Sequence, residues 1–245
     1  MNELRPDRAV APLDVPGRIG LVDYGMGNLA SVERALVAVA RRAEVVRVTA
    51  AAALDEVQAV VLPGVGAFEA AMRSLRELGL DRGLRAYLDA GRPLLGICLG
   101  YQILFEAGEE SAREAGGARD WVPGLGYFPG VVRRFPPGVT VPHMGWNRLE
   151  LTGTACPLFR PGDAPPYVYF AHSYYPAPQQ AGVVTAWCRV GAVRFAAAAW
   201  RGRAGGVQFH PEKSGATGLS LLRRFVGWAL GAGAEGDEAR GATVA

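Results

Sequence analysis

The residues on either side of Cys98 make it a candidate nucleophile. It lies between two glycines in GICLG (96–100), where an apolar run meets a segment with helical character. This is the cysteine form of the Gly-x-Ser-x-Gly nucleophile elbow, a sharp turn from a strand into a helix. Such a turn places the sulfur at a helix N-terminus, where the helix dipole and free N–H groups favour the thiolate. A buried core cysteine at a glycine-rich strand end is the competing interpretation.

The segment QFHPE (208–212) offers a base for that sulfur. Pro211 biases His210 away from helical dihedrals, and in an extended chain residues two apart point to the same side. Glu212 can then hydrogen-bond one ring nitrogen of His210 and leave the other for Cys98, as in a nucleophile, base and orienter triad. A solvated loop histidine is the alternative. Because the chain has three histidines and three cysteines, the two signals together favour catalysis.

The glycine-rich turn LPGVG (62–66) is the third segment with chemical potential. Its glycines permit unusual dihedrals and expose backbone N–H groups. An N–H from Val65 or Gly66, paired with that of Leu99, would form an oxyanion hole for a tetrahedral intermediate. A phosphate-binding loop is the rival, but neither a P-loop lysine nor Gly-x-Gly-x-x-G is present. A turn with neither an oxyanion-binding nor a phosphate-binding role is the remaining interpretation.

The composition predicts a soluble cytoplasmic protein without nucleic-acid or membrane partners. The chain has 245 residues, half of them hydrophobic, and a formal net charge of +3 with scattered arginines. No stretch approaches the roughly 18 uninterrupted apolar residues of a membrane span, and the start has no apolar signal core. Cys98, Cys156 and Cys188 are widely spaced without a Cys-x-x-Cys pair. We therefore expect no disulfide framework, no metal and no cofactor.

The first half of the chain alternates between strand and helix patterns. Apolar runs predict strands over 18–24, 44–49, 59–64 and 92–98, and helical spacing is found over 29–40, 67–90 and 99–108. Such strands, which lack strict alternation and are separated by helices, indicate a parallel sheet covered on both faces. The class is therefore α/β.

The second half is rich in β-type runs broken by glycine and proline, which predicts a mixed or antiparallel section attached to the same sheet. A late strand over 206–212 and a closing helix around 219–229 follow. We expect one domain over 18–230, with a flexible N-terminal arm over 1–17 and a disordered C-terminal tail over 231–245.

Three segments in order, PGVGAF (63–68), GICLGYQILFE (96–106) and QFHPEKS (208–214), resemble the class I (triad) glutamine amidotransferase family. The match runs from about residue 18 to residue 230. DYGMGNLASV (23–32), PHMGWN (142–147) and YFAHSYY (169–175) look like the family branch of histidine biosynthesis, the glutaminase subunits of imidazole glycerol phosphate synthase. The resemblance implies a flavodoxin-like three-layer fold with a mixed, mostly parallel central sheet and an antiparallel section from the second half.

The resemblance also implies a reaction. The Cys98 thiolate attacks the glutamine side-chain amide, His210 passes a proton to the leaving nitrogen, and Glu212 orients the histidine. Ammonia leaves, and water hydrolyses the thioester to glutamate. Family glutamine-binding positions correspond to Gln102, His172 and Ser173.

The same resemblance implies a partner, a (β/α)8-barrel cyclase that receives the ammonia in a heterodimer. It forms imidazole glycerol phosphate and aminoimidazole carboxamide ribonucleotide (AICAR). Lys213, Trp146, His143 and Asn28 are then expected at the interface. Lys213 is the only lysine among 26 Lys and Arg residues, and a compact ammonium pairs with a partner carboxylate differently from a planar Arg fork. A chance remainder of the Arg-rich composition is the alternative.

Three other functions remain open from the sequence. One is the glutaminase of another class I amidotransferase, for anthranilate or pyridoxal phosphate synthesis, against which PHMGWN and GMGN argue. Another is a stand-alone cysteine hydrolase or peptidase on a similar elbow. The third is a catalytically inactive scaffold subunit, which the intact Cys98, His210 and Glu212 set disfavours.

Overall fold

The computed structural model describes residues 10–115 and 118–232. In this part of the chain, eight strands form the largest sheet, in the order β2-β1-β3-β4-β14-β13-β12-β9. The strands from β2 to β14 run parallel, and those from β13 to β9 are antiparallel additions. The bounds are β1 Gly17–Val22, β2 Ala43–Val48, β3 Ala59–Leu62, β4 Leu94–Ile97, β9 Glu150–Leu151, β12 Val184–Val190, β13 Val193–Arg201 and β14 Ala204–Val207.

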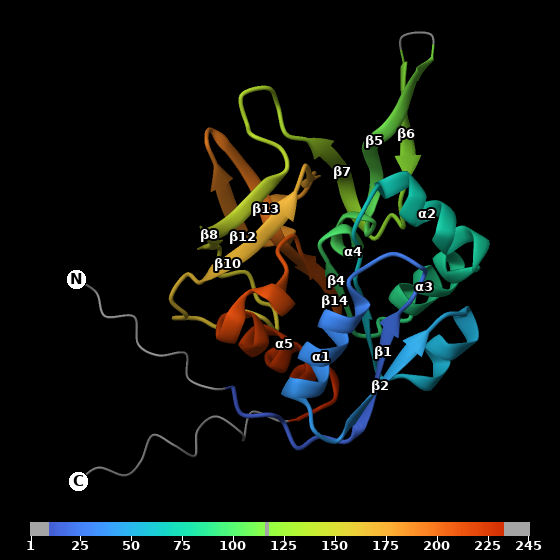
Figure 1. Cartoon of the computed structure of the whole chain (residues 1–245), viewed down its shortest axis with the longest axis vertical. Coiled ribbons are helices and arrows are strands. Elements are labelled where there is room, and N and C mark those ends of the chain that lie inside the picture. The colour runs from blue at the N-terminus through green and yellow to red at the C-terminus, as the bar shows by residue number, and fades with distance from the viewer. Residues whose placement is uncertain (1–9, 116–117, 233–245) are drawn as a thin grey trace, which may run out of the picture.

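Helices cover both faces of this sheet, giving three layers (Figure 1). Helices α1 (Leu29–Val39) and α5 (Gly215–Ala229) lie together on one face, and α2 (Phe68–Glu77) and α3 (Leu80–Asp89) lie on the other. The central strands have apolar side chains on both faces. Val61 belongs to the core beneath α1 and α5, whereas its neighbours Val60 and Leu62 belong to the opposite core. Such strands carry continuous apolar runs because neither face meets water.

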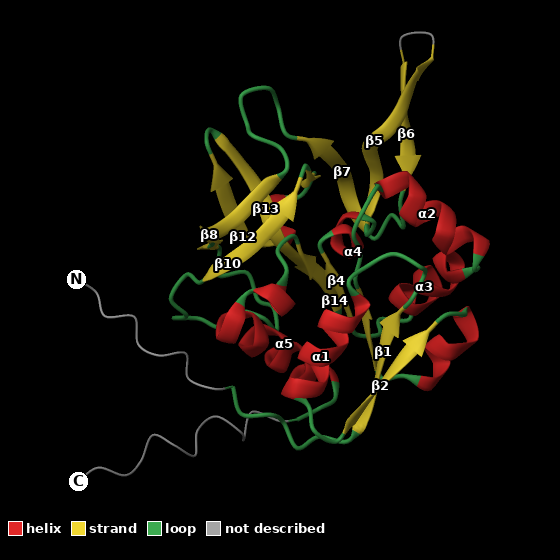
Figure 2. Ribbon diagram, viewed as in Figure 1, coloured by secondary structure: helices red, strands yellow, loops and turns green. Residues whose placement is uncertain are grey.

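Two smaller sheets extend the fold (Figure 2). Strands β8 (His143–Arg148) and β10 (Tyr167–His172) form an antiparallel pair. The other sheet has the order β11-β7-β5-β6, with bounds β5 Phe105–Ala115, β6 Ala118–Pro123, β7 Phe128–Arg134 and β11 Tyr174–Pro178. The short 3-10 helices are η1 Ala51–Glu56, η2 Ala181–Val183 and η3 Pro211–Lys213. The predicted antiparallel section is present, but only part of it joins the main sheet.

The helix predicted over 99–108 is wrong beyond its first turn. Helix α4 spans only Leu99–Gln102, and β5 begins at Phe105. The apolar run after Gln102 reflects burial and not helical periodicity, because Ile103, Leu104 and Phe105 are all fully buried. A continuous apolar run does not distinguish a strand from a helix. The chain leaves the helix so that Phe105 and the residues after it can pair with β7.

Two other expected elements are divided. The helical pattern over 67–90 forms α2 and α3, which are separated at Gly79 with φ of +66°, a left-handed conformation suited to glycine. The run YFAHSYY is split at Ser173 between β10 and β11, which belong to different sheets. The split bends the chain beside the carboxyl end of β4, where it borders a cavity.

The chain ends are described only in part. Residues 1–9 of the expected arm and 233–245 of the expected tail lie outside the described residues. From residue 10 onward the arm contacts the domain: Leu13 pairs with Ala40, and Arg223 donates a hydrogen bond to the Ala11 carbonyl at 2.8 Å. Among the described residues, no helix is both long enough and apolar enough to cross a membrane.

Candidate active site

The turn at Cys98 lies at the carboxyl edge of the parallel strands. Its backbone has φ of +55° and ψ of −109°, and Cys98 is the only non-glycine residue with positive φ in the described part of the chain. Such a conformation costs about 1–3 kcal/mol and persists where the surrounding structure enforces it. Here the Cys98 N–H donates to the Val207 carbonyl at 2.8 Å, which ties the elbow to β14.

Both glycines of the elbow are required, for different reasons. A Cβ on Gly96 would lie 2.7 Å from the Gly100 carbonyl oxygen, across the turn. A Cβ on Gly100 would lie 1.7 Å from the carbonyl oxygen of Leu62, at the end of β3. The Gly96 contact lies within the turn itself. The structure shows that Gly100 instead allows α4 to approach the neighbouring strand.

His210 and Glu212 meet behind Cys98. The Nδ1 atom of His210 lies 2.8 Å from Glu212 Oε1, and the two side chains are 5% and 1% exposed. The imidazole also interacts with the Cys98 side chain. Burial lowers the pKa of His210, but the hydrogen bonds with Cys98 and Glu212 outweigh it and raise that pKa to about 10. The raised pKa therefore favours a protonated imidazole beside the Cys98 side chain.

The local chain path differs from the predicted extended strand. Strand β14 ends at Val207, and Pro211–Lys213 form a 3-10 turn. His210 itself is extended, as its position before proline favours. Glu212 therefore reaches His210 because the chain turns at Pro211, and not because alternate residues of a strand share a face. The predicted contact is present, but the reasoning that led to it was wrong.

The main chain of His210 is fixed to β10 by three hydrogen bonds. Its N–H donates to the Tyr169 carbonyl at 2.9 Å, and the Ser214 hydroxyl donates to the His210 carbonyl at 2.7 Å. The same hydroxyl oxygen accepts from the Tyr169 N–H at 3.0 Å. Ser214 is buried and was not identified from the sequence. These contacts fix the main chain that carries the imidazole.

A cavity of about 190 Å³ opens in front of the sulfur. Its walls include the middle of YFAHSYY, where the segment is split, and the glycine-rich turn. The lining residues are Val65, Gly66, Cys98, Gln102, Glu110, Pro142, Ala171, His172, Ser173 and Tyr174. All the predicted glutamine-binding residues lie on this wall, as do two of the three predicted oxyanion residues. The third, Leu99, begins α4, and N–H groups in the first turn of a helix have no intrahelical acceptor.

Glu110 is a cavity residue that sequence reasoning missed. It is half-buried on β5, and its Oε2 accepts a hydrogen bond from the N–H of Phe68, the first residue of α2, at 2.7 Å. Burial raises the pKa of Glu110, and the Phe68 hydrogen bond opposes that shift. The mistaken helix over 99–108 concealed this residue, because only a strand from residue 105 carries Glu110 to the cavity.

His172 is buried on the cavity wall and uncharged. Burial lowers the pKa of His172 to about 3, with smaller contributions from His143 and His210. Its Nδ1 lies 2.8 Å from the Tyr174 carbonyl oxygen, which can only accept, so Nδ1 carries the proton. Its Nε2 is buried without a hydrogen-bond partner among the described residues. The ring therefore offers a lone pair inside the site.

The four predicted interface residues differ in exposure. Lys213, Trp146 and Asn28 are exposed, and Trp146 packs edge-on against Tyr169 with ring centroids 6.0 Å apart. His143 is half-buried and its ring centroid lies 5.4 Å from that of His172.

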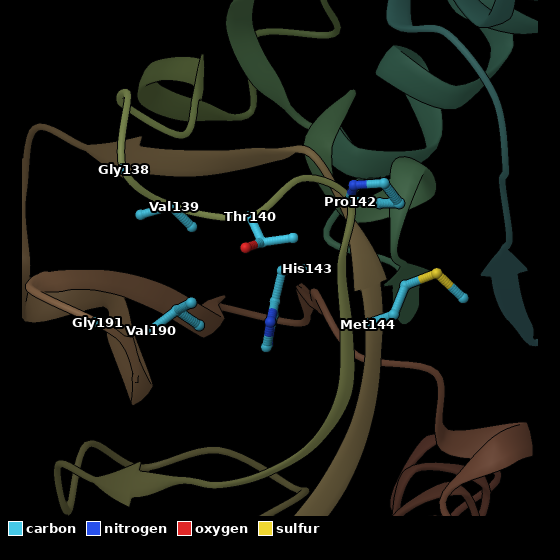
Figure 3. A pocket seen from close by; sticks show the side chains of 8 residues that line it. All are labelled: Gly138, Val139, Thr140, Pro142, His143, Met144, Val190 and Gly191. Carbon is cyan, nitrogen blue, oxygen red and sulfur yellow. The ribbon is translucent and has the colours of Figure 1, made fainter.

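His143 belongs to a second cavity of about 310 Å³, where Figure 3 shows its ring with Thr140 and Val190 beside it. Pro142 borders both this cavity and the one in front of Cys98, so the two are neighbours. Burial lowers the pKa of His143, which keeps the ring neutral at pH 7. The side chain of His143 thus faces inward, while its strand neighbours Met144 and Trp146 face outward.

The other two cysteines differ from Cys98 in their surroundings. Burial raises the pKa of Cys188 to about 12, and burial also raises the pKa of Cys156. Neither lines the cavity next to His210. Thiols with raised pKa values are poor nucleophiles because the thiolate is the reactive form. Cys98 is therefore the cysteine whose setting suits catalysis.

Comparison with known proteins agrees with this geometry. The family model for glutamine amidotransferase class-I matches residues 20–227. A protein of Thermosynechococcus vestitus named imidazole glycerol phosphate synthase subunit HisH is 46% identical over 210 residues, covering 85% of this chain and 95% of that protein. The protein of the same name from Gloeobacter violaceus is 44% identical over 227 residues, covering 92% and 96%.

Solved structures share the fold at low sequence identity. A crystal structure of a glutamine amidotransferase superposes with a TM-score of 0.63 at 22% identity, covering 87% of this chain and 98% of that one. The structure of PurLQS from Thermotoga maritima gives a TM-score of 0.66 at 18% identity, covering 87% and 99%. The elbow, the buried histidine–glutamate pair and the extent of these matches lead to one conclusion: this chain belongs to the class I glutamine amidotransferase family.

Proposed function

We propose that this chain is the glutaminase subunit of an imidazole glycerol phosphate synthase, which hydrolyses glutamine and passes the ammonia to a cyclase subunit. The observation that carries the proposal is that Cys98 lines a small cavity and interacts with the buried His210–Glu212 pair. The names and lengths of the relatives supply the rest, since both match nearly end to end.

The size of the cavity favours an amino acid over a peptide. Its 190 Å³ is below the roughly 300–1,000 Å³ of pockets that take drug-sized ligands. Gln102 and Glu110 lie on its wall together with the carbonyls and N–H groups of the Ser173 turn. We assign Glu110 to the substrate ammonium group, because it is the only carboxylate that the described residues place on this wall. A peptidase would need an open groove instead.

In the first chemical step, the Cys98 thiolate attacks the side-chain carbonyl carbon of glutamine. The carbonyl oxygen becomes an oxyanion, which accepts hydrogen bonds from the Leu99 N–H and from an N–H of the Val65–Gly66 turn. The His210 imidazolium, held by Glu212, donates its proton to the amide nitrogen. The C–N bond breaks, ammonia leaves, and a γ-glutamyl thioester remains on Cys98.

In the second step, neutral His210 takes a proton from a water molecule that attacks the thioester carbonyl. The C–S bond breaks, glutamate leaves, and the thiolate–imidazolium pair is restored. The raised pKa of His210 suits this cycle, because the ring then holds the proton that the first step donates to the amide nitrogen.

Ammonia is useful to a second enzyme only if it stays out of bulk water, which would protonate it. The outward face of β8 offers a surface for such a partner. Met144 and Trp146 are 61% and 54% exposed, and Lys213 lies beyond the triad with its side chain in solvent. Exposed aromatic and methionine side chains are typical of protein interfaces. We assign this surface to the barrel-shaped cyclase, with a heterodimer as the product.

The test is a glutaminase assay with and without the cyclase subunit and its ligand. The proposal expects slow glutamate release from the isolated chain, faster release with the cyclase and ligand, and imidazole glycerol phosphate and AICAR as products. Fast glutamate release that the cyclase does not change would contradict it and favour another class I amidotransferase, such as those of anthranilate or pyridoxal phosphate synthesis.

A further inference from the structure

A fully buried glutamine, Gln208, lies beside the nucleophile and has no role in the mechanism above. Strands β4 and β14 pair in parallel with Ile97 opposite Val207, so the next residue of each strand, Cys98 and Gln208, emerge side by side. The Gln208 side chain is 0% exposed, and its Nε2 lies 3.6 Å from the Cys98 sulfur. Burying an amide costs free energy unless its polar atoms are hydrogen-bonded, so its partners matter.

The direction of this amide is fixed by its neighbours. The Tyr174 carbonyl oxygen lies 2.9 Å from Gln102 Nε2 and accepts only, so Gln102 must present its amino group there. The same Nε2 lies 3.0 Å from Gln208 Oε1. Gln208 must then accept with its oxygen and donate with its own nitrogen, and that nitrogen faces the sulfur. Each side chain in this chain of hydrogen bonds has one allowed orientation.

We infer that Gln208 is a further catalytic residue, whose side-chain N–H hydrogen-bonds the Cys98 thiolate and stabilises it relative to the thiol. The inference rests on the proposed function for its purpose but not for its geometry. An N–H donor favours the ionised sulfur because a thiolate accepts hydrogen bonds strongly and a thiol accepts them weakly. Gln208 and the imidazole of His210 then hold the sulfur from two directions.

The same hydrogen bonds connect the sulfur to the wall that faces the substrate. Both N–H groups of Gln102 are used by the Tyr174 carbonyl and Gln208, so its Oε1 is the atom that can meet a donor in the cavity. Gln208 thereby orients Gln102 as well as Cys98. Loss of Gln208 should affect thiolate formation and glutamine binding together.

The experiment measures alkylation of Cys98 by iodoacetamide against pH, followed on the Cys98 peptide by mass spectrometry. Q208M keeps the shape and removes both amide groups, and Q208E keeps the acceptor for Gln102 but replaces the donor. We expect the alkylation midpoint of Q208M to rise by about one pH unit, and that of Q208E to rise further because an anion faces the sulfur. Q58L is the matched control: Gln58 accepts from the Arg18 N–H far from the sulfur, and its loss should leave the midpoint unchanged.

Glutaminase assays of the same variants in complex with the cyclase give a second readout. For Q208M we expect kcat/KM near pH 7 to fall about tenfold, with partial recovery at higher pH as the thiolate forms. A purely structural role would lower activity equally at every pH. Circular dichroism melting checks that each variant is folded. If only one of Q208M and Q208E folds, that variant alone tests the inference.

An alkylation midpoint within about 0.3 pH unit of the wild type in a folded variant would overturn the inference. So would a lower midpoint, which would mean that Gln208 faces the sulfur with its oxygen and stabilises the thiol. The alkylation assay uses no glutamine and no partner. If the shift occurs in a protein that lacks glutaminase activity, the proposed function fails and the role of Gln208 at the thiolate stands.

Discussion

Two parts of the molecule border the active-site cavity and are built in opposite ways. The parallel strands β3, β4 and β14 are buried on both faces, and the polar groups at their carboxyl ends find partners within the chain. Strand β8 instead alternates inward and outward residues and leaves Met144 and Trp146 in solvent. The groups proposed for the chemistry therefore find their partners within one chain, whereas the surface beside them exposes large apolar side chains.

The largest expected effect is the loss of glutamine-dependent activity in C98A, which should leave the surface on β8 unaffected. C98A should lower glutamine-dependent synthesis by the complex about 10⁴-fold or more, because the nucleophile is lost and no other group replaces it. Synthesis from added ammonium salts should be unchanged, because the cyclase and its docking surface remain. Product formation with each nitrogen source measures both. Loss of the ammonium-dependent activity would show that Cys98 also serves the interface.

The tight packing of the parallel half predicts a large stability effect. G100A would place a Cβ 1.7 Å from the Leu62 carbonyl oxygen, a backbone atom that cannot yield without moving β3. We expect a loss of about 3 kcal/mol or more in the free energy of unfolding. G182A is the control, since its Cβ would meet nothing within 4 Å and no positive φ is involved. Urea unfolding curves should show an unaltered or slightly higher stability for G182A; equal losses in both variants would refute the packing argument.

The buried histidine between the two parts predicts a pH effect. The pKa of His172 is about 3 in the folded chain, below its ordinary value of about 6.5. Between these values the unfolded chain binds a proton that the folded chain does not, so stability falls as pH falls from about 6.5 toward 3. From pH 7 to pH 5, wild type should lose about 2 kcal/mol more than H172N, whose amide keeps the bond to the Tyr174 carbonyl.

Urea unfolding at the two pH values measures this difference. H143N is the matched control, because His143 is only half-buried and its pKa shift is smaller in consequence. An equal acid sensitivity in wild type and H172N would show that His172 is not the group responsible.

The last prediction concerns the surface proposed for the cyclase. W146A should weaken cyclase binding by about 2 kcal/mol, roughly 30-fold in Kd, because a large exposed aromatic would be lost from the interface. The stability of the isolated chain should change by less than about 0.5 kcal/mol, since Trp146 is 54% exposed. V37A, at an equally exposed residue of α1, should change neither. Calorimetric titration measures the affinity; unchanged binding by W146A would move the interface elsewhere.

The sequence predicted the parts of the site that depend on a single local pattern, such as glycine spacing or an apolar run. The elbow glycines and the apolar runs at 59–64 and 92–98 located Cys98 at the edge of a parallel sheet. His210 and Glu212 were paired through their spacing alone, although the turn at Pro211 and not a strand brings them together. Short-range patterns were sufficient for these residues. His210 and Glu212 are two positions apart, and Cys98 directly follows a strand whose apolar composition is clear.

Glu110 and Gln208 escaped because their roles depend on contacts across the fold. Glu110 reaches the cavity only if the buried run after Gln102 becomes a strand, and burial hides that choice from periodicity. The proposed role of Gln208 depends on the parallel register of β4 and β14, which places it beside Cys98. It also depends on the Tyr174 carbonyl of β11, which orients Gln102. No spacing in the sequence reports which strands become neighbours, so these partners required coordinates.

The most direct test of the account is covalent labelling by a chloroketone analogue of glutamine, read by peptide mass spectrometry. We predict one adduct, on the peptide that contains Cys98, with labelling suppressed by excess glutamine and absent in C98A. Adducts on Cys156 or Cys188 at a similar rate, or labelling that glutamine does not suppress, would contradict the claim that one activated sulfur faces a glutamine-sized site.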